Sequence, residues 1–457
     1  MRLQVRRRLL TGLGANVFGQ IIVALVQLVG VPILLHAWGA RLYGEWLVLF
    51  AIPSFLSMTD LGFSQSAAND MRQKVARGEQ SNANAVFQSL CALVYAAAAA
   101  GMLTVTALLF LLPIQDWTHL SAIPPNAVRW ILLLLSLEIL VRLTDGINHA
   151  GYRAAGDYAF HTTIYFITLL CQYASIWAVA SLGYGPVLAA LAYLMVRCVA
   201  TPVVALVLVR KHPWLRIGFV DARLPELRRL ASPALANLSM PLAQALSIQG
   251  MVVVVGAILG PIAVVVFSTL RTLARLALQM VSVVGNAAEP EFAAAFGRHD
   301  QRLLRALFVH ALRAGLWLAV AAASCLLILG KFVLEHWTHG NIQMDVTLFK
   351  YLLASSVASV LWYSSLMLLK AANLHLRASF LYSVTAATVV AFTAVILNLS
   401  GRLSDAGLAL LAMDTVMGLY TLRAASRVVG LTAAASILQA VNPFPLIRVA
   451  LRRANAT

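Results

Sequence analysis

Charged residues are scarce in this sequence, and acidic residues are the scarcest of them. Only 11% of the 457 residues are charged whereas 61% are hydrophobic, and 34 Lys and Arg stand against 17 Asp and Glu. A soluble core cannot hide so much apolar surface, so the composition predicts a polytopic membrane protein. The net charge of +17 lies in short breaks between apolar runs. It therefore indicates cytoplasmic loops and contact with anionic lipids, and not a nucleic-acid partner.

The sequence also lacks the motifs of an ATPase or a metalloenzyme. It contains no phosphate-binding GxxxxGK[ST] loop, no HExxH and no paired Cys/His spacing, so we expect no catalytic residue, metal or cofactor. Any transport must then be driven by a gradient or by the flow of substrate. Asp145 and His149 are the nearest approach to an acyltransferase or glycosyltransferase site. The four cysteines lie in apolar runs at unrelated spacings, which indicates neither metal nor disulfide: Cys91, Cys171, Cys198 and Cys325.

Apolar runs long enough to cross a bilayer recur along the whole chain. A bilayer core needs about 20 apolar residues per helix, and this length predicts about twelve spans. Backbone groups in lipid must hydrogen-bond within their own segment, so the expected fold class is all-α. The expected spans are 10–36, 43–67, 84–112, 128–150, 159–182, 186–209, 232–258, 262–289, 304–329, 346–370, 377–399 and 404–426.

The basic residues between these spans are distributed unevenly. When the loops are sorted alternately, one set holds nearly all of them, and the other holds little more than Arg41, Lys331 and Arg402. Basic residues near the ends of spans stay in the cytoplasm. The asymmetry predicts an even number of spans with both termini in the cytoplasm. The first apolar run is too long for a cleaved signal peptide.

The longest polar break, 210–229, divides the chain into halves that resemble each other. Residues 221 positions apart match in one register: Asn16 with Asn237, Gly39 with Gly260, and Phe87 with Phe308. Two six-span repeats of the same orientation are typical of two-lobed transporters, whose substrate site lies between the lobes. The expected divisions are an N-terminal lobe at 1–209, a cytoplasmic basic loop at 210–229, a C-terminal lobe at 230–427 and a basic amphipathic tail at 428–457.

Ionisable residues inside the expected spans are the candidate functional residues, because a charge in lipid is costly. Glu138, Arg142 and Asp145 share one helix face by their spacing, which fits either an internal ion pair or a functional cluster. Arg271 and Arg275 share a face of the eighth span with no acidic residue within a turn. We expect these two cations to face a wet cavity or a partner helix.

Cations outnumber acids at mid-span, and this surplus favours an anionic substrate. Guanidinium groups suit phosphate through their forked donors, although pairing with acids across helices is the structural alternative for each of them. The candidates for binding a diphosphate or an acidic glycan are Arg271, Arg275, Arg142, Arg197 and Arg313. The candidates for ion coupling are Asp60, Glu138 and Asp414, and the expected polar lining of the cavity is Asn16, Gln20, Asn237 and Gln244.

Residues 39–46 (GARLYGEW), followed by 60–63 (DLGF) and a basic loop, resemble the start of the polysaccharide-repeat-unit flippases. These Wzx-type transporters of O-antigen and exopolysaccharide pathways share a superfamily with multidrug and toxin extrusion transporters and lipid II flippases. The motif-level resemblance covers roughly residues 10–70, and the resemblance in layout covers the whole chain.

The resemblance implies an alternating-access flippase that moves a polyprenyl-diphosphate-linked oligosaccharide from the inner to the outer leaflet of a bacterial inner membrane for polysaccharide biosynthesis. It implies as partners this lipid-linked oligosaccharide and the polymerase and glycosyltransferases of the same pathway. Two alternatives stay open. One is a cation-coupled multidrug exporter of the same superfamily, disfavoured by the lack of an acidic residue in 9–36. The other is a membrane subunit of a polysaccharide-synthesis complex without transport of its own.

Overall fold

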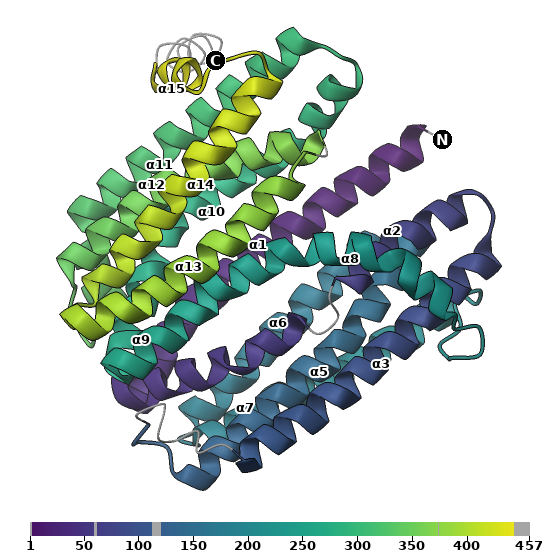
Figure 1. Ribbon diagram of the computed structural model, residues 1–457. Helices are drawn as coiled ribbons and strands as arrows, with labels where there is room; N and C mark the ends of the chain where they lie inside the picture. The colour runs from purple at the N-terminus through teal and green to yellow at the C-terminus, as the bar shows by residue number, and fades with distance from the viewer. Residues whose placement is uncertain (1, 59–61, 112–119, 373, 443–457) are drawn as a thin grey trace. The chain divides into compact units, whose positions relative to one another are not determined.

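The computed structural model describes residues 2–58, 62–111, 120–372 and 374–442, and every regular element in these ranges is a helix (Figure 1). The expected all-α fold class is thus confirmed. The elements are α1 (Arg2–Ala51), η1 (Pro53–Met58), α2 (Phe63–Ala76), α3 (Gln80–Leu111), α5 (Pro125–Ala155), α6 (Tyr158–Ser181), α7 (Pro186–Lys211), α8 (Leu224–Ala245), the π-helix η2 (Leu246–Gly250), α9 (Met251–Leu259), α10 (Pro261–Gly297), α11 (Gln301–Trp337), α12 (Val346–Ala371), α13 (Leu376–Ser400), α14 (Ser404–Val428) and α15 (Ala433–Val441).

Nine helical stretches in the described part of the chain are long and apolar enough to cross a membrane. The number is lower than the twelve expected spans, and one of these, 262–289, extends beyond the residues whose side chains are described. The first stretch, Gly14–Met58, runs through two expected spans. Helix α5 is long enough to cross, but its sequence carries five charged side chains. The chain is therefore a multi-pass membrane protein.

The second expected span, 43–67, is wrong in its bounds. Helix α1 continues past a break at Gly39, where φ is 70° and ψ is 170°, and ends at Ala51. A 3₁₀ turn follows from Pro53, because proline lacks an N–H donor and disfavours the helical conformation of the residue before it. Helix α2 then begins after Gly62, which has φ 76°. Asp60 lies outside the described residues.

The sequence 39–46 has a structural role in this region. The Glu45 side chain is fully buried, and it accepts hydrogen bonds from the backbone N–H groups of 121–123 at 2.7 to 2.8 Å. These bonds fix the segment that leads into α5. A Cβ atom on Gly44 would lie 2.2 Å from the Pro261 carbonyl oxygen, so glycine is needed for the close approach of two backbones.

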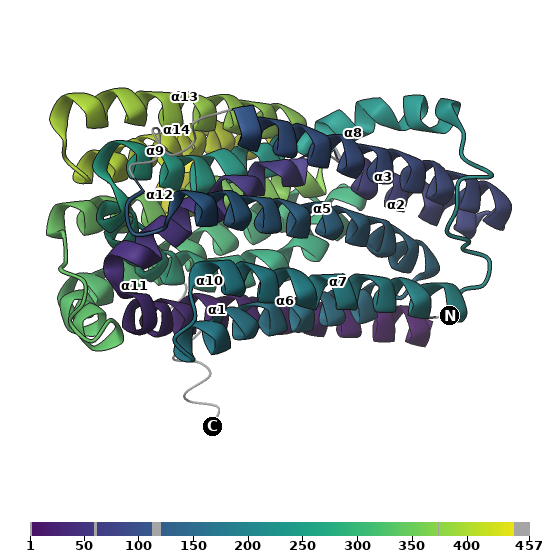
Figure 2. The same cartoon turned by 90° about the horizontal axis from the view of Figure 1, so that it is seen from below.

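The described contacts divide the chain into two compact units. Unit 1 comprises 1–245 with 260–265, and unit 2 comprises 246–259 with 266–457. In unit 1, α6 packs on α1 and α7, and α5 packs on α2, α3 and α7; α5, α6 and α7 run side by side (Figure 2). Its core is apolar and includes the fully buried side chains of Met71, Phe87 and Tyr152.

A cluster of hydrogen-bonded charged residues outside the spans joins the α5–α6 turn to the end of α7. Asp157 accepts from Lys211 Nζ and His212 Nε2, each at 2.8 Å from Oδ2. Partial burial acts to raise the pKa of Asp157, but the hydrogen bonds and charges of these two partners outweigh it and hold the pKa below its ordinary value. The carboxylate is thus stabilised in its ionised form.

In unit 2, α12 and α14 pack along each other over most of their length, and α11 covers α12. The contact is close because the facing residues are small. A Cβ on Gly407 of α14 would lie 2.8 Å from Leu348, and one on Gly418 would lie 3.2 Å from Leu361. Small residues at helix interfaces permit such approach in membrane proteins. Five buried serines of α12 lie on this helix: Ser355, Ser356, Ser359, Ser364 and Ser365.

Candidate functional site

The charged centre of unit 1 is Arg197 on α7, whose side chain is 2% exposed. Its Nε lies 3.4 Å from Glu138 Oε1, and its NH1 lies 3.8 Å from Asp145 Oδ2. The two acids are seven residues apart on α5, which is about two helical turns, so both face α7. A buried charge must be paired and hydrogen-bonded. Arg197 is therefore neutralised across helices by two carboxylates.

Gln172 on α6 completes this network. Its Nε2 donates to Glu138 Oε1 at 2.9 Å and to the Tyr193 carbonyl at 3.1 Å, and its Oε1 accepts from Arg197 NH2 at 2.7 Å. The guanidinium also lies 5.6 Å from the centre of the Tyr165 ring. An amide can bridge an acid and a base because it offers both a donor and an acceptor. The network thus holds α5, α6 and α7 in register.

The second acid of the network, Asp145, has two further partners. Its Oδ1 lies 3.4 Å from His161 Nε2 and accepts from Asn148 Nδ2 at 3.3 Å. His161 is buried, and its Nδ1 has no hydrogen-bond partner among the described residues. Arg197 was expected at a substrate site and Glu138 at a coupling site, and Asp145 was expected to share a helix face with Glu138. The structure gives each of them a protein partner.

Arg142 is not paired with Glu138 in the i,i+4 manner that the sequence suggested as an alternative. The Glu138 carboxylate turns to Arg197 instead. Arg142 is half-buried and forms no ion pair within 4 Å with a described carboxylate. Its electrostatic interactions are with Glu138 and with three tyrosines, Tyr165, Tyr173 and Tyr193. This guanidinium is the part of the unit 1 cluster that retains free donors in a polar, aromatic surrounding.

In unit 2, Arg271 binds the wide turn formed by the π-helix. Its NH2 donates to the Ser247 carbonyl at 2.9 Å, and its NH1 approaches the Ile248 carbonyl at 3.4 Å. A π-turn shifts the helical hydrogen bonds from i+4 to i+5, and such turns are frequent at functional sites. The guanidinium also lies 5.6 Å from the Phe267 ring centre. Arg271 therefore stabilises an irregular backbone.

Arg275 lies one turn further along α10 and is half-buried. No described carboxylate lies within ion-pair distance of it, and its electrostatic interactions are with Arg271 and Tyr382. The Tyr382 hydroxyl is 3.4 Å from Ser247 Oγ. Arg271 and Tyr382 thus contact the π-turn, and Arg275 adds a second positive charge beside them.

Asp414 on α14 is buried and is held by uncharged donors. Trp362 Nε1 donates to Oδ1 at 3.0 Å, and Ser355 Oγ donates to Oδ2. Asp414 and Arg271 interact electrostatically, but the described structure contains no ion pair between them. The acid therefore balances only part of the charge of the two arginines. Neutral donors such as Trp362 do not stand out in a sequence, so its role was missed.

Arg313 has a structural partner that the sequence did not suggest. Its Nε and NH2 donate to the Gln439 carbonyl at 3.1 and 2.6 Å, and Trp317 Nε1 donates to the Val441 carbonyl at 3.2 Å. Both carbonyls lie at the end of α15. The last carbonyls of a helix lack intrahelical partners, so Arg313 satisfies one of them. It joins the tail to α11.

The expected polar cavity lining is exposed where the structure describes it. Asn16 accepts from the Tyr158 hydroxyl at 3.2 Å and, like Gln20, is exposed in unit 1. Gln244 is also exposed. The side chain of Asn237 lies outside the described residues.

No protein-family model matches this sequence, and no curated protein matches it. Solved structures do. One, described as the inward-facing conformation of a multidrug resistance MATE family transporter of the MOP superfamily, is 14% identical, with a TM-score of 0.65, over 90% of this chain and 95% of that chain. A MATE protein in the bent conformation is 13% identical, with a TM-score of 0.61, over 95% and 99% of the two chains.

A MOP superfamily transporter from Pyrococcus furiosus, described as having a binding pocket of reverse polarity, is 14% identical, with a TM-score of 0.57, over 90% of this chain and 95% of that one. At these identities the likeness shows the fold and not the substrate. This chain has the two-lobed, all-helical fold of the MATE transporters of the MOP superfamily.

Proposed function

We propose that this protein is a flippase for an anionic, lipid-linked glycan, moving a polyprenyl-diphosphate-linked oligosaccharide to the outer leaflet of a bacterial inner membrane. The observation that carries the proposal is Arg275, a half-buried guanidinium one turn from Arg271 with no described carboxylate within ion-pair distance. An uncompensated cation inside a span is costly and marks a functional site by default. A diphosphate would supply the missing negative charge through charge-assisted hydrogen bonds.

We take two of the five arginines of the sequence prediction as leading candidates. Arg197 is paired with two carboxylates, Arg313 donates to a backbone carbonyl, and Arg271 donates to the π-turn. Arg275 in unit 2 and Arg142 in unit 1 remain for the substrate. The tyrosines around Arg142 offer hydroxyl groups, which suit the hydroxyls of a sugar. The flippase would act with the polymerase and glycosyltransferases of one pathway, with both of its termini in the cytoplasm.

A second candidate function is cation-coupled drug export. Asp414 favours it, because a buried carboxylate that is hydrogen-bonded but not ion-paired suits reversible protonation. Proteins of this fold include a multidrug resistance transporter. Asp414→Asn is then expected to abolish dye efflux, whereas Arg275→Gln leaves it unchanged.

The decisive experiment deletes the gene in its own host, so that the glycan is matched to the transporter. The deletion strain is complemented with wild type, Arg275→Gln, Arg142→Gln or Arg305→Gln. We then measure surface polysaccharide and the lipid-linked precursor that stays inside the cell. Arg305 is an exposed cation on α11 and provides the matched control. Loss of one charge-assisted contact corresponds to about 1.5–3 kcal/mol, so the first two variants should slow export roughly ten- to hundredfold.

The deletion alone already tests the reaction. A strain that keeps its surface polysaccharide and accumulates no precursor is not lacking a flippase, and dye efflux becomes the next assay. The deletion can have the expected effect while Arg275→Gln and Arg142→Gln export glycan at the same rate as Arg305→Gln. The flippase function is then supported, but these two arginines are not the substrate site. Membrane expression of every variant is measured in parallel.

A further inference from the structure

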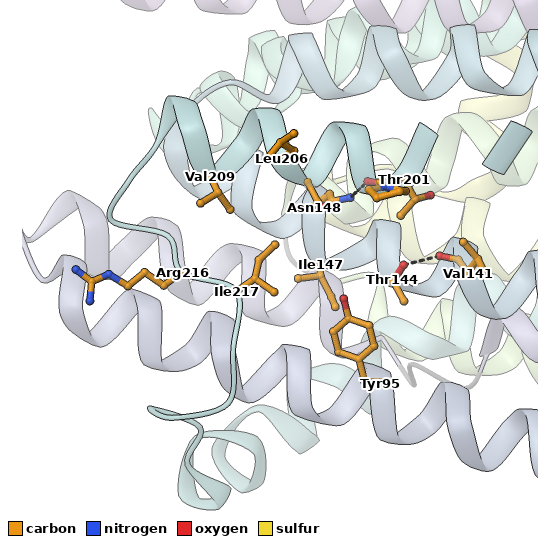
Figure 3. A pocket seen from close by; sticks show the side chains of 12 residues that line it. Tyr95, Val141, Thr144, Ile147, Asn148, Thr201, Leu206, Val209, Arg216 and Ile217 are labelled. Carbon is orange, nitrogen blue, oxygen red and sulfur yellow. Dashed lines mark hydrogen bonds between the residues drawn. The ribbon is translucent and has the colours of Figure 1, made fainter. Parts of the chain in front are cut away.

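Unit 1 contains a pocket of about 600 Å³ next to its charged network, between α3, α5 and α7 (Figure 3). The lining is mainly apolar and includes Ile147, Leu206, Val209 and Ile217. This volume falls in the range of pockets that bind small ligands, which is roughly 300–1,000 Å³. The proposed substrate site makes no use of it.

Two polar side chains of the pocket are bound to protein groups. Asn148 Nδ2 donates to the Thr201 carbonyl at 3.2 Å and to Asp145 at 3.3 Å, and the Thr144 hydroxyl donates to the Val141 carbonyl at 2.7 Å (Figure 3). The Thr201 hydroxyl, which belongs to the same lining, has no hydrogen-bond partner among the described residues. The larger part of the lining is apolar and suits a hydrocarbon chain.

The segment 212–223, which follows α7, forms the outer wall of the pocket and is held by hydrogen bonds. Two buried residues of α3 hold its backbone. Asn84 Oδ1 accepts from the Arg216 N–H at 2.8 Å, and Gln88 binds the Arg216 carbonyl at 3.2 Å and the Asp221 N–H at 2.6 Å. The amide side chains of these two α3 residues thus hold the segment in place. The pocket wall does not depend on a bound ligand.

The same segment presents apolar and basic side chains to its surroundings. Phe219 is 58% exposed and Val220 is 94% exposed, and they lie between Arg216 and Arg223. Both arginines are exposed and form no ion pair with a described carboxylate. Aromatic and aliphatic groups between cations are typical of a segment that lies in the lipid headgroup layer. In Figure 3 the stem of Arg216 borders the pocket and its guanidinium extends away from the apolar interior.

The pocket opens onto an apolar stripe of α7. Met195, Val199, Val203 and Leu206 recur at helical spacing and are 47%, 65%, 53% and 50% exposed. Side chains three and four residues apart form one face of a helix. Such a face in a membrane-spanning helix contacts lipid chains, and Leu206 belongs both to this face and to the pocket. The pocket is therefore accessible from the bilayer.

We propose that this pocket and the segment 212–223 form a binding site for an anionic phospholipid of the cytoplasmic leaflet. One acyl chain occupies the pocket, and the phosphate lies between Arg216 and Arg223. The charge distribution of the sequence places this segment on the cytoplasmic side. Basic residues next to spans attract anionic headgroups. The occupant is a bulk phospholipid because the site faces the bilayer. This assignment does not rest on the proposed flippase activity.

The test uses the full-length protein in detergent, titrated with phosphatidylglycerol or phosphatidylcholine of identical acyl chains, with bound lipid counted by native mass spectrometry. Wild type should prefer phosphatidylglycerol. Arg216→Gln/Arg223→Gln should lower this preference about 30-fold, because each arginine near an anionic surface contributes about a factor of five. Arg302→Gln, an exposed cation of unit 2, should leave it unchanged.

Filling the pocket tests the acyl chain separately from the headgroup. Ala205 lines the pocket, so Ala205→Trp should displace the bound lipid of either kind, and Ala205→Leu provides a milder change if the tryptophan variant does not fold. Equal binding of the two lipids by wild type, or binding that neither the arginine pair nor the Ala205 variants reduce, would overturn the proposal. Displacement of phosphatidylglycerol by a polyprenyl phosphate at equal concentration would also overturn it and assign the pocket to the glycan carrier.

Discussion

Replacing Arg197 by methionine would leave Glu138 and Asp145 inside unit 1 without their cation. Methionine keeps an unbranched, apolar stem but supplies none of the hydrogen bonds. Removing one partner of a buried ion pair costs about 3–5 kcal/mol, because it leaves an uncompensated charge. The Gln172 carbonyl would also lose its donor at 2.7 Å, which adds about 1 kcal/mol. We therefore expect Arg197→Met to lower the free energy of unfolding by about 4–6 kcal/mol.

The matched variant removes the whole set of charges at once. In Glu138→Gln/Asp145→Asn/Arg197→Met no ion is left buried without a partner, and apolar or neutral replacements of a buried ion pair are often close to neutral. This triple variant should lie within about 1.5 kcal/mol of wild type. Denaturant unfolding in mixed micelles, followed by tryptophan fluorescence, measures both differences.

The reasoning is refuted if Arg197→Met unfolds like wild type, or if the triple variant is as unstable as the single one. A transport readout separates structure from function. The triple variant should still export the glycan, because Arg197, Glu138 and Asp145 are paired with one another. A folded triple variant that does not export would show that these charges act on the substrate or the coupling ion.

Three further outcomes follow from the described contacts. Gly44→Ala places a Cβ 2.2 Å from the Pro261 carbonyl oxygen and should destabilise the fold by about 1–3 kcal/mol in thermal unfolding, whereas Gly14→Ala, with nothing within 4 Å, should not. Asp157→Asn should cost about 1 kcal/mol at neutral pH. Because the folded pKa of Asp157 is lowered, wild type should lose this advantage as the pH falls through that pKa, and unfolding curves of the two proteins should then converge. Arg313→Gln should release α15 and speed limited proteolysis of that segment; an unchanged cleavage rate would contradict the contact.

The helices and the fold class could be predicted because apolar length alone dictates them in a bilayer. The repeat register was informative as well. Gly39 and Gly260, which it pairs, both have positive φ, at 70° and 85°, and Phe87 and Phe308 are both fully buried. The bounds of 43–67 were wrong because a proline and a glycine break that run locally, where hydropathy averages over them.

The partners of the charges could not be predicted in the same way. Glu138 has a base four residues away on its own helix, yet it pairs with Arg197, which is distant in sequence. Such pairing depends on how α5, α6 and α7 are rotated about their axes. The π-turn at Ser247 has no signal in the sequence composition, so the carbonyl partners of Arg271 could not be predicted either.

The glycines of α14 have a consequence for how this protein can vary. A Cβ atom at Gly407 would meet Leu348 and Tyr351 of α12, and one at Gly418 would meet Leu361, so these two positions admit almost no added volume. The serines of α12 are held by hydrogen bonds instead: Ser355 donates to Asp414, and Ser356 donates to the Ala274 carbonyl at 3.1 Å. An apolar side chain is therefore not sufficient at this seam. A single valine in place of either glycine would force the two helices apart, however well it suits a membrane.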